Sequence, residues 1–374
     1  MGLSKRMRRS WLWVGCGVIG VAFCATLSAY GSAASNSSAR VAAKKPPFTM
    51  VLANGYVGNE YRIEMENDFK AAVAMPPYKS TVKSSVYNAG TSVATQTSQL
   101  QSIIASKPDA ILLDGNSPTA ENAVVQHACS VGIVVVTYDN EVTAPCAAKI
   151  STDPAYYAIT NARWIVQKLH GKGNVVMVTG VPGQPVDTVR NQAALKVFKQ
   201  YPGIKIIASV VGMWDSATTE RVLAPVIATY SKIDGVWVSA GTDGAVTAFQ
   251  KAGRKLPVIG GESENGFRVA IARYGKKGFE GQSVDGSPVY LSVLALQYAV
   301  EVLEGKRQPS QTVVFKPFIM TPANAKLGVN AYPNLPNGIF DDFASPDVPM
   351  CPNGALKGTP CKGTLHVTIP PASS

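Results

Sequence analysis

The sequence is poor in charged residues and in histidine, and it lacks the motifs of the common enzyme classes. Charged residues make up 16% of the 374 residues and hydrophobic residues 46%, a composition that excludes a disordered tail protein or a collagen-like fibre. The three histidines stand apart from one another. No HExxH, GxSxG or GxxxxGK(S/T) motif occurs, nor a GxGxxG after the first expected strand. We therefore expect a binding protein without a cofactor or a metal, not an enzyme.

The N-terminus has the three parts of a secretory signal. Four bases, at residues 5, 6, 8 and 9, precede an apolar run over 11–27, and small residues follow as far as residue 34. We expect residues 1–34 to be removed on export and residues 35–46 to form a flexible leader. Losing four bases lowers the net charge from +11 to +7, a diffuse excess that does not predict a nucleic-acid partner. An uncleaved anchor is the alternative, because about seventeen apolar residues approach the length of a membrane span.

Four cysteines follow the expected signal: Cys129, Cys146, Cys351 and Cys361. An even number of cysteines in an exported chain predicts disulfides, and four cysteines allow three pairings. The simplest pairing joins sequence neighbours, Cys129 with Cys146 and Cys351 with Cys361. A zinc site is the alternative, but no CxxC spacing and no nearby histidines support it.

Short apolar runs alternate with segments of helical spacing through most of the chain. The strands are expected at 49–54, 84–87, 110–113, 133–138, 174–179, 204–211, 235–239, 257–260, 282–284 and 312–315. Helices are expected at 93–104, 119–130, 156–169, 188–201, 218–230, 245–252, 267–274 and 289–303, with one more before the second strand. The strand runs are apolar throughout, which is typical of parallel sheets covered by helices on both faces.

The pattern starts again near Ser151, so the sequence predicts an α/β protein with two doubly wound parallel-sheet domains joined by a hinge. We expect an N-terminal lobe of residues 47–151 and 286–312 and a C-terminal lobe of residues 152–285 and 313–340. A tail over 341–374, rich in proline and containing two cysteines, would be either an ordered extension or a loose end.

Polar and aromatic residues follow nearly every expected strand. Ligands of open parallel sheets bind beyond the carboxyl ends of the strands, where these residues would lie. Carboxylates and amides bind hydroxyl groups, and aromatic rings cover the C–H faces of a sugar, so the set predicts a polyhydroxyl site. The alternatives are a helix cap for Asn59, a first-turn charge for Asp243 and a core position for Trp214. The candidate binding residues are Asn59, Tyr61, Arg62, Asn116, Asp139, Asn140, Arg190, Trp214, Asp243, Glu262 and Asp285.

Six stretches resemble the type I periplasmic sugar-binding proteins, the ribose/galactose-like solute-binding components of ABC importers. They are KPDAILLDGNSP, GIVVVTYDNE, GNVVMVTGVPG, IDGVWVSAGTDGAVTAFQKAG, LPVIGGESENG and GQSVDGSP, and the resemblance covers about residues 48–320. It implies the periplasmic-binding-protein type I fold.

The resemblance also implies roles for single residues. The family's first-loop contacts fall on Asn59 and Tyr61, and its stacking aromatic falls on Trp214. Its other polar contacts fall on Asp139, Arg190, Glu262 and Asp285. Two positions depart from the family: Asn140 stands where an arginine is common, and Gly241 where an asparagine is frequent. A pentose, a larger sugar, a polyol and a non-sugar ligand all remain open.

The sequence therefore predicts a monomeric periplasmic protein that closes around a small sugar or polyol. Such a protein would deliver its ligand to an ABC permease in the inner membrane. Two other functions remain open. One is a sensory protein that presents the ligand to a receptor. The other is a periplasmic hydrolase with Asp139 and Glu262 as its carboxylate pair.

Overall fold

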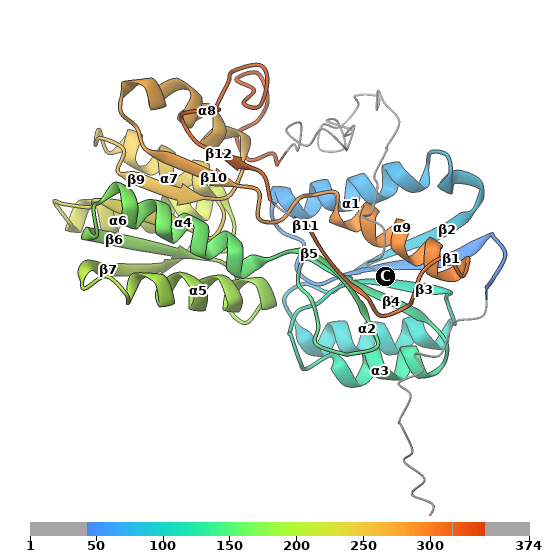
Figure 1. Ribbon diagram of the computed structural model, residues 1–374. Helices are drawn as coiled ribbons and strands as arrows, with labels where there is room; N and C mark the ends of the chain where they lie inside the picture. The colour runs from blue at the N-terminus through green and yellow to red at the C-terminus, as the bar shows by residue number, and fades with distance from the viewer. Residues whose placement is uncertain (1–42, 316, 341–374) are drawn as a thin grey trace, which may run out of the picture. The chain divides into compact units, whose positions relative to one another are not determined.

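Two six-stranded sheets organise residues 43–315 and 317–340, the part of the chain that the computed structural model describes (Figure 1). The first sheet has the order β11-β5-β4-β3-β1-β2, and its neighbouring strands are all parallel. These strands are β1 (Phe48–Asn54), β2 (Val82–Asn88), β3 (Ala110–Asp114), β4 (Val134–Tyr138), β5 (Ala148–Thr152) and β11 (Thr312–Phe315). The apolar runs identified in the sequence therefore do form a parallel sheet.

The second sheet has the order β12-β10-β9-β8-β6-β7, and only its edge strand β12 runs antiparallel. Its strands are β6 (Lys172–Thr179), β7 (Gly203–Val211), β8 (Gly235–Val238), β9 (Val258–Gly261), β10 (Gly281–Val284) and β12 (Ile319–Met320). The predicted fold class, two parallel-sheet α/β domains, is confirmed.

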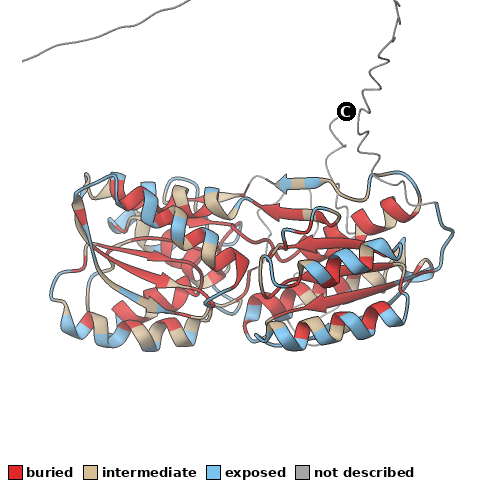
Figure 2. Ribbon diagram, turned by 90° about the horizontal axis from the view of Figure 1, so that it is seen from below, coloured by how far each residue is buried: buried red, intermediate tan, exposed pale blue. Residues whose placement is uncertain are grey.

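Helices cover both faces of each sheet. The first sheet packs against α1 (Glu60–Val73), α2 (Val93–Ala105), α3 (Asn122–Ser130) and α9 (Leu291–Leu303). The second packs against α4 (Pro154–Lys168), α5 (Pro185–Phe198), α6 (Ser216–Thr229), α7 (Thr242–Lys251) and α8 (Asn265–Tyr274), and short turns η1 (Tyr78–Ser80) and η2 (Gly275–Lys277) follow α1 and α8. Figure 2 shows the buried strands between helices whose outer faces are exposed.

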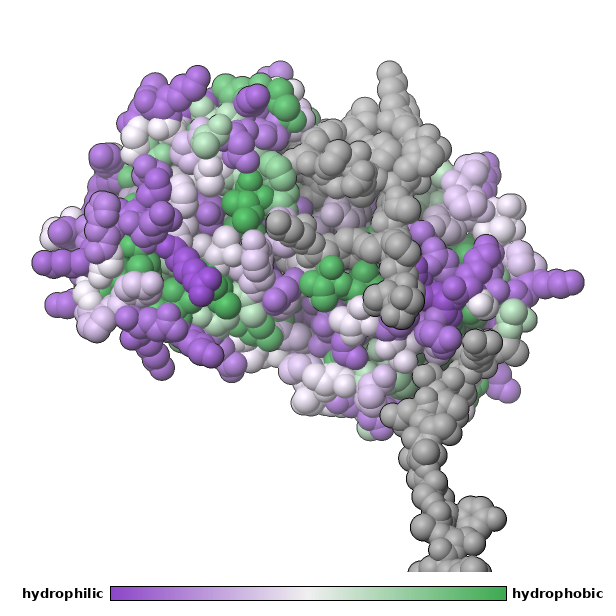
Figure 3. All heavy atoms as spheres, in the orientation of Figure 1, coloured by the Kyte–Doolittle hydropathy of each residue, from purple (hydrophilic) through white to green (hydrophobic). Residues whose placement is uncertain are grey.

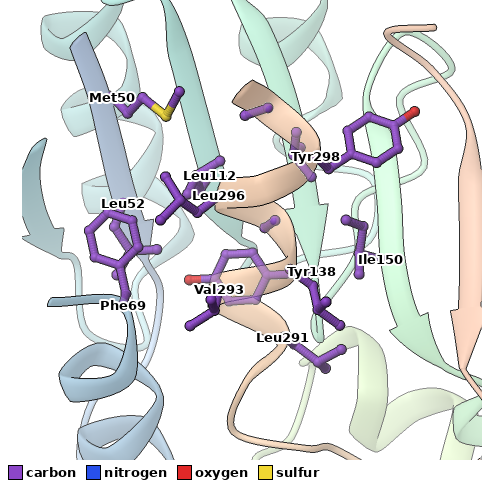
Figure 4. Close-up of a cluster of buried hydrophobic side chains, with 14 of the residues drawn as sticks. Met50, Leu52, Phe69, Leu112, Tyr138, Ile150, Leu291, Val293, Leu296 and Tyr298 are labelled. Carbon is purple, nitrogen blue, oxygen red and sulfur yellow. The ribbon is translucent and has the colours of Figure 1, made fainter. Parts of the chain in front are cut away.

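Each sheet therefore has an apolar core on both faces. In one of them Leu112 of β3 lies beside Leu296 of α9 (Figure 4). Polar residues cover much of the face drawn in Figure 3, where hydrophobic residues form small separate patches. Among the described residues, no helix has both the length and the apolar character needed to cross a membrane.

The structure differs from the sequence-based expectations at four places. β5 was not predicted, because its AKIST sequence mixes polar and apolar residues; β12 is only two residues long and was also missed. The third helix begins at Asn122 and not at residue 119, because the Ser117 hydroxyl accepts the Thr119 and Ala120 N–H groups and holds a turn there. The expected lobe boundary between 312 and 313 falls inside β11, which pairs along its whole length with β5 of the first sheet.

One of the two expected disulfides lies within the described residues. Cys129, near the end of α3, is bonded to Cys146, which stands just before β5. The expected bridge between Cys351 and Cys361, the signal over 1–34 and the tail over 341–374 lie outside the described residues.

Candidate ligand-binding site

A cavity lies at the carboxyl ends of the strands, and residues of both sheets' domains line it. The empty space among its walls, part of which opens to solvent, is about 310 Å³. The lining residues are Asn59, Tyr61, Arg62, Asp139, Val186, Arg190, Trp214, Ala240, Glu262, Ser287 and Phe340.

Arg62 is the centre of the first lobe's contribution. It lies in the first turn of α1, where the Asn59 side chain caps the helix by accepting the Arg62 N–H. Its guanidinium lies 2.5 Å from Asp114 Oδ2 and 2.7 Å from Asp139 Oδ2. Asp114 ends β3 and Asp139 follows the adjacent strand β4, so the parallel pairing brings the two acids to one edge. Burial raises the pKa of Asp114 to about 7, although Arg62 acts in the opposite direction.

Arg190 of α5 is the centre of the second lobe's contribution to the cavity. Its Nη2 lies 2.8 Å from Glu262 Oε2 and donates to Ser287 Oγ at 3.0 Å, while Nη1 donates to the Ser239 carbonyl at 2.6 Å. The guanidinium carbon also lies 3.8 Å from the centre of the Tyr157 ring. Burial raises the pKa of Glu262, against the lowering effect of Arg190. Each lobe thus presents one buried arginine that is held in place by carboxylates.

Aromatic rings form the apolar walls of the cavity. Trp214 is 7% exposed, and its indole Nε1 donates to Ser239 Oγ at 2.9 Å. A Cβ on Gly180 would lie 1.9 Å from that nitrogen, so only glycine leaves room for the indole. Tyr61 lies edge-on to Phe340 with ring centres 5.3 Å apart. Trp214 and Asp139 both have a positive φ, at 57° and 52°, a strained conformation that often marks functional sites.

The structure brings seven of the expected residues to the cavity wall: Asn59, Tyr61, Arg62, Asp139, Arg190, Trp214 and Glu262. Asn59 combines the two roles considered for it. It caps α1, and its Nδ2 also donates to the Trp214 carbonyl of the second lobe at 3.1 Å.

The other four expected residues do not line the cavity. Asn116 and Asn140 join the lobes instead: Gln184 Nε2 donates to Asn116 Oδ1 at 2.6 Å, and the Val186 N–H donates to Asn140 Oδ1 at 2.9 Å. Asp243 lies in the first turn of α7 and accepts a hydrogen bond from the Ser216 hydroxyl. This position agrees with the alternative of a first-turn charge for this residue. Asp285 follows β10, and its charge raises the pKa of Glu262.

Sequence reasoning did not list Asp114, Val186, Ala240, Ser287 or Phe340 as candidates. Asp114 directly follows a predicted strand and could have been found by the rule that selected Asp139. Val186 and Ala240 are apolar and carry no signal of a site, and Phe340 follows the last strand by twenty residues.

Comparisons with known proteins agree with this geometry. A model of the periplasmic binding protein domain matches residues 50–307. A xylitol-binding protein of Mycolicibacterium smegmatis is 28% identical over 240 residues, which cover 62% of this chain and 67% of that protein. A D-apiose import binding protein of Paraburkholderia graminis is 27% identical over 185 residues, 48% of this chain and 59% of that protein.

A solved structure is also similar. The crystal structure of an ABC transporter solute binding protein from Thermobispora bispora has a TM-score of 0.66 and 29% identity, and the match covers 74% of this chain and 86% of that one. The resemblance noted in the sequence is therefore confirmed, with the same two parallel-sheet lobes. This chain belongs to the periplasmic binding protein family, with the type I fold.

Proposed function

We propose that this protein is the exported solute-binding component of an ABC importer, and that it captures a small uncharged sugar or polyol between its lobes. The observation that carries the proposal is the pair of buried arginines, Arg62 and Arg190, one from each lobe on a common cavity. The relatives that bind xylitol and import D-apiose support it.

The polar groups of the cavity suit hydroxyls. A hydroxyl both donates and accepts, so it can bridge an arginine N–H and a neighbouring carboxylate oxygen. Both kinds of group stand together here, as Arg62 with Asp139 and as Arg190 with Glu262. An arginine pairs with each of these carboxylates. They are therefore better suited to act as fixed hydrogen-bond acceptors than as the general acid and the nucleophile of a hydrolase.

The charges of the cavity favour an uncharged ligand. Among its described lining residues, the two arginines are matched by two acids, Asp139 and Glu262. An anionic ligand would compete with these acids for the same guanidinium groups, and a cationic ligand would meet arginines. A neutral polyol avoids both costs.

Contacts between the lobes support a role in capture. The Asn59, Asn116 and Asn140 side chains each bond to the second lobe around the cavity. A ligand that contacts both lobes favours this arrangement over one with the lobes apart, and so gives a permease a bound form to recognise. Family membership supports a periplasmic location.

A matched ligand series tests the proposal. We expect neutral five-carbon polyols and sugars to raise the melting temperature of the exported protein, because a ligand bound only by the folded state stabilises it. Xylitol and xylonate differ mainly by one carboxylate, and isothermal titration should show xylonate binding at least about tenfold more weakly. Tight binding of acids with no response to any neutral sugar or polyol would contradict the proposal.

The Trp214 indole should cover an apolar face of the ligand. Trp214→Ala should weaken binding by about tenfold to a hundredfold, or roughly 1–3 kcal/mol, through lost stacking and burial. Titration of the best neutral ligand into the variant measures this loss. Trp164→Ala is the matched control, since Trp164 lies on α4 and does not line the cavity.

The alternative is that Trp214 serves only as a core residue, because it also packs with Val181, Val186 and Ala240. In that case the unliganded variant would lose several kcal/mol of stability while its affinity stayed unchanged. Trp214→Phe separates the contribution of the aromatic ring from that of the indole hydrogen bond, because it keeps a ring and loses the bond to Ser239.

A further inference from the structure

Residues 331–340 follow the last strand and run from one lobe to the other. We call this segment the strap. It lies beyond the 50–307 range that the family model matches. Its start belongs to the second lobe, and its last residue, Phe340, lines the ligand cavity.

Asn265, the first residue of α8, fixes the strap to the second lobe. Its Nδ2 donates to the carbonyls of Tyr332 and Pro336 at 2.8 and 3.1 Å, and its Oδ1 accepts the Tyr332 N–H at 2.8 Å. The Asn265 N–H also donates to the Ile339 carbonyl at 2.8 Å. The first turn of a helix has N–H groups without partners in the helix, and the strap accepts two of them, because the Gly266 N–H donates to the Asn337 carbonyl at 2.8 Å.

Phe340 connects the strap to the first lobe. Its N–H donates to the Glu64 carboxylate of α1 at 3.0 Å, and its ring lies edge-on to Tyr61. Phe340 is 4% exposed, so its ring is almost wholly enclosed between α1 and the cavity. The strap therefore makes contacts on both sides of the cavity, with Asn265 in the second lobe and with Glu64 and Tyr61 in the first.

We propose that Phe340 is a specificity-determining residue whose ring limits the length of the ligand, and that the strap holds it there by bonding to both lobes. The proposal rests on the proposed function for the nature of the ligand. The Phe340 ring in the cavity wall offers no partner to a hydroxyl, so a longer polyol that reached the ring would lose a hydrogen bond or displace it.

Two polyols that differ by one carbon test this role. In the full exported protein we expect the wild type to prefer xylitol over the six-carbon sorbitol. Phe340→Ala should weaken xylitol binding and shift the ratio of the two dissociation constants toward sorbitol by roughly tenfold or more, as one carbon commonly does in a fitted pocket. Isothermal titration gives both constants.

Ile339→Ala is the matched control, because Ile339 is buried in the strap but does not line the cavity. A structural role of the strap would lower the stability of both variants and leave the ratio unchanged. An unchanged ratio in Phe340→Ala, or an equal shift in Ile339→Ala, would overturn the specificity role while the proposed function stands.

Hydrogen exchange tests the strap without relying on a polyol. We expect the Phe340 amide to be protected, and Glu64→Leu to raise its exchange rate at least tenfold while the Asn265 amide stays protected. If the wild type bound no sugar or polyol, the proposed function would fail. If the Phe340 amide then exchanged at the rate of an unstructured peptide, the claim that the strap bonds to both lobes would also be wrong. If the amide were protected, that claim would stand without the specificity role.

Discussion

The free energy of unfolding should fall as the pH rises from about 4 to about 8, and Asp68→Asn should remove part of this fall. Asp68 lies on α1 and is 5% exposed, and its Oδ2 has no hydrogen-bond partner among the described residues. Burial alone raises its pKa from 3.8 to about 8. Between these two values the folded state holds a proton that the unfolded state has lost. Stability therefore decreases with rising pH, by up to about 1.4 kcal/mol per pH unit.

Urea unfolding at several pH values measures this effect. Asparagine resembles the protonated acid, so the variant should match the wild type near pH 4 and exceed it by several kcal/mol at pH 8. Glu60→Gln is the control, an exposed acid in the first turn of the same helix. Equal slopes for the wild type and Asp68→Asn would show that Asp68 does not carry the effect. Other buried acids with a raised pKa, such as Glu262, would account for a remaining slope of the same sign.

Most of the fold could be predicted because the strands of a parallel sheet are apolar throughout and differ clearly from their neighbours. AILLD and GVWV are examples, and both form fully buried strands. β5 lacks this signal, because Lys149, Ser151 and Thr152 lie in it, and one of its two partners, β11, comes from a distant part of the chain. A strand that forms by pairing with distant residues cannot be found by local pattern alone.

The site could be predicted in part because strand ends converge in a parallel sheet. Asp139 and Glu262 were found by this rule, and the arginines by their place at helix starts. The rule cannot tell a residue that faces the cavity from one that joins the lobes. Asn140 follows Asp139 directly, yet its side chain accepts a bond from the other lobe. Phe340 was beyond reach, because its position depends on the strap's bonds to Asn265 and Glu64.

Arg190→Met should abolish ligand binding, lowering affinity at least about a hundredfold. Arg190 is 2% exposed, and its guanidinium joins Glu262, Ser287 and the Ser239 carbonyl at the cavity wall. Its loss removes charged donors to the ligand and leaves the acceptor Glu262 without its cation, and charged hydrogen bonds of this kind contribute about 1.5–3 kcal/mol each. Isothermal titration with the best neutral ligand measures the loss. Arg221→Met, on the exposed side of α6, should bind as the wild type does.

Stability must be separated from binding in this variant. A buried carboxylate that loses its partner destabilises a protein by about 3–5 kcal/mol, so Arg190→Met alone should also melt earlier. The double variant Arg190→Met with Glu262→Gln has no unpaired charge at this position, and we expect it to recover most of the stability. It should not recover affinity, because the ligand needs the guanidinium itself. An affinity within threefold of the wild type in either variant would mean that the second lobe binds the ligand through other groups. A double variant that recovered both properties would mean that Arg190 serves only to neutralise Glu262.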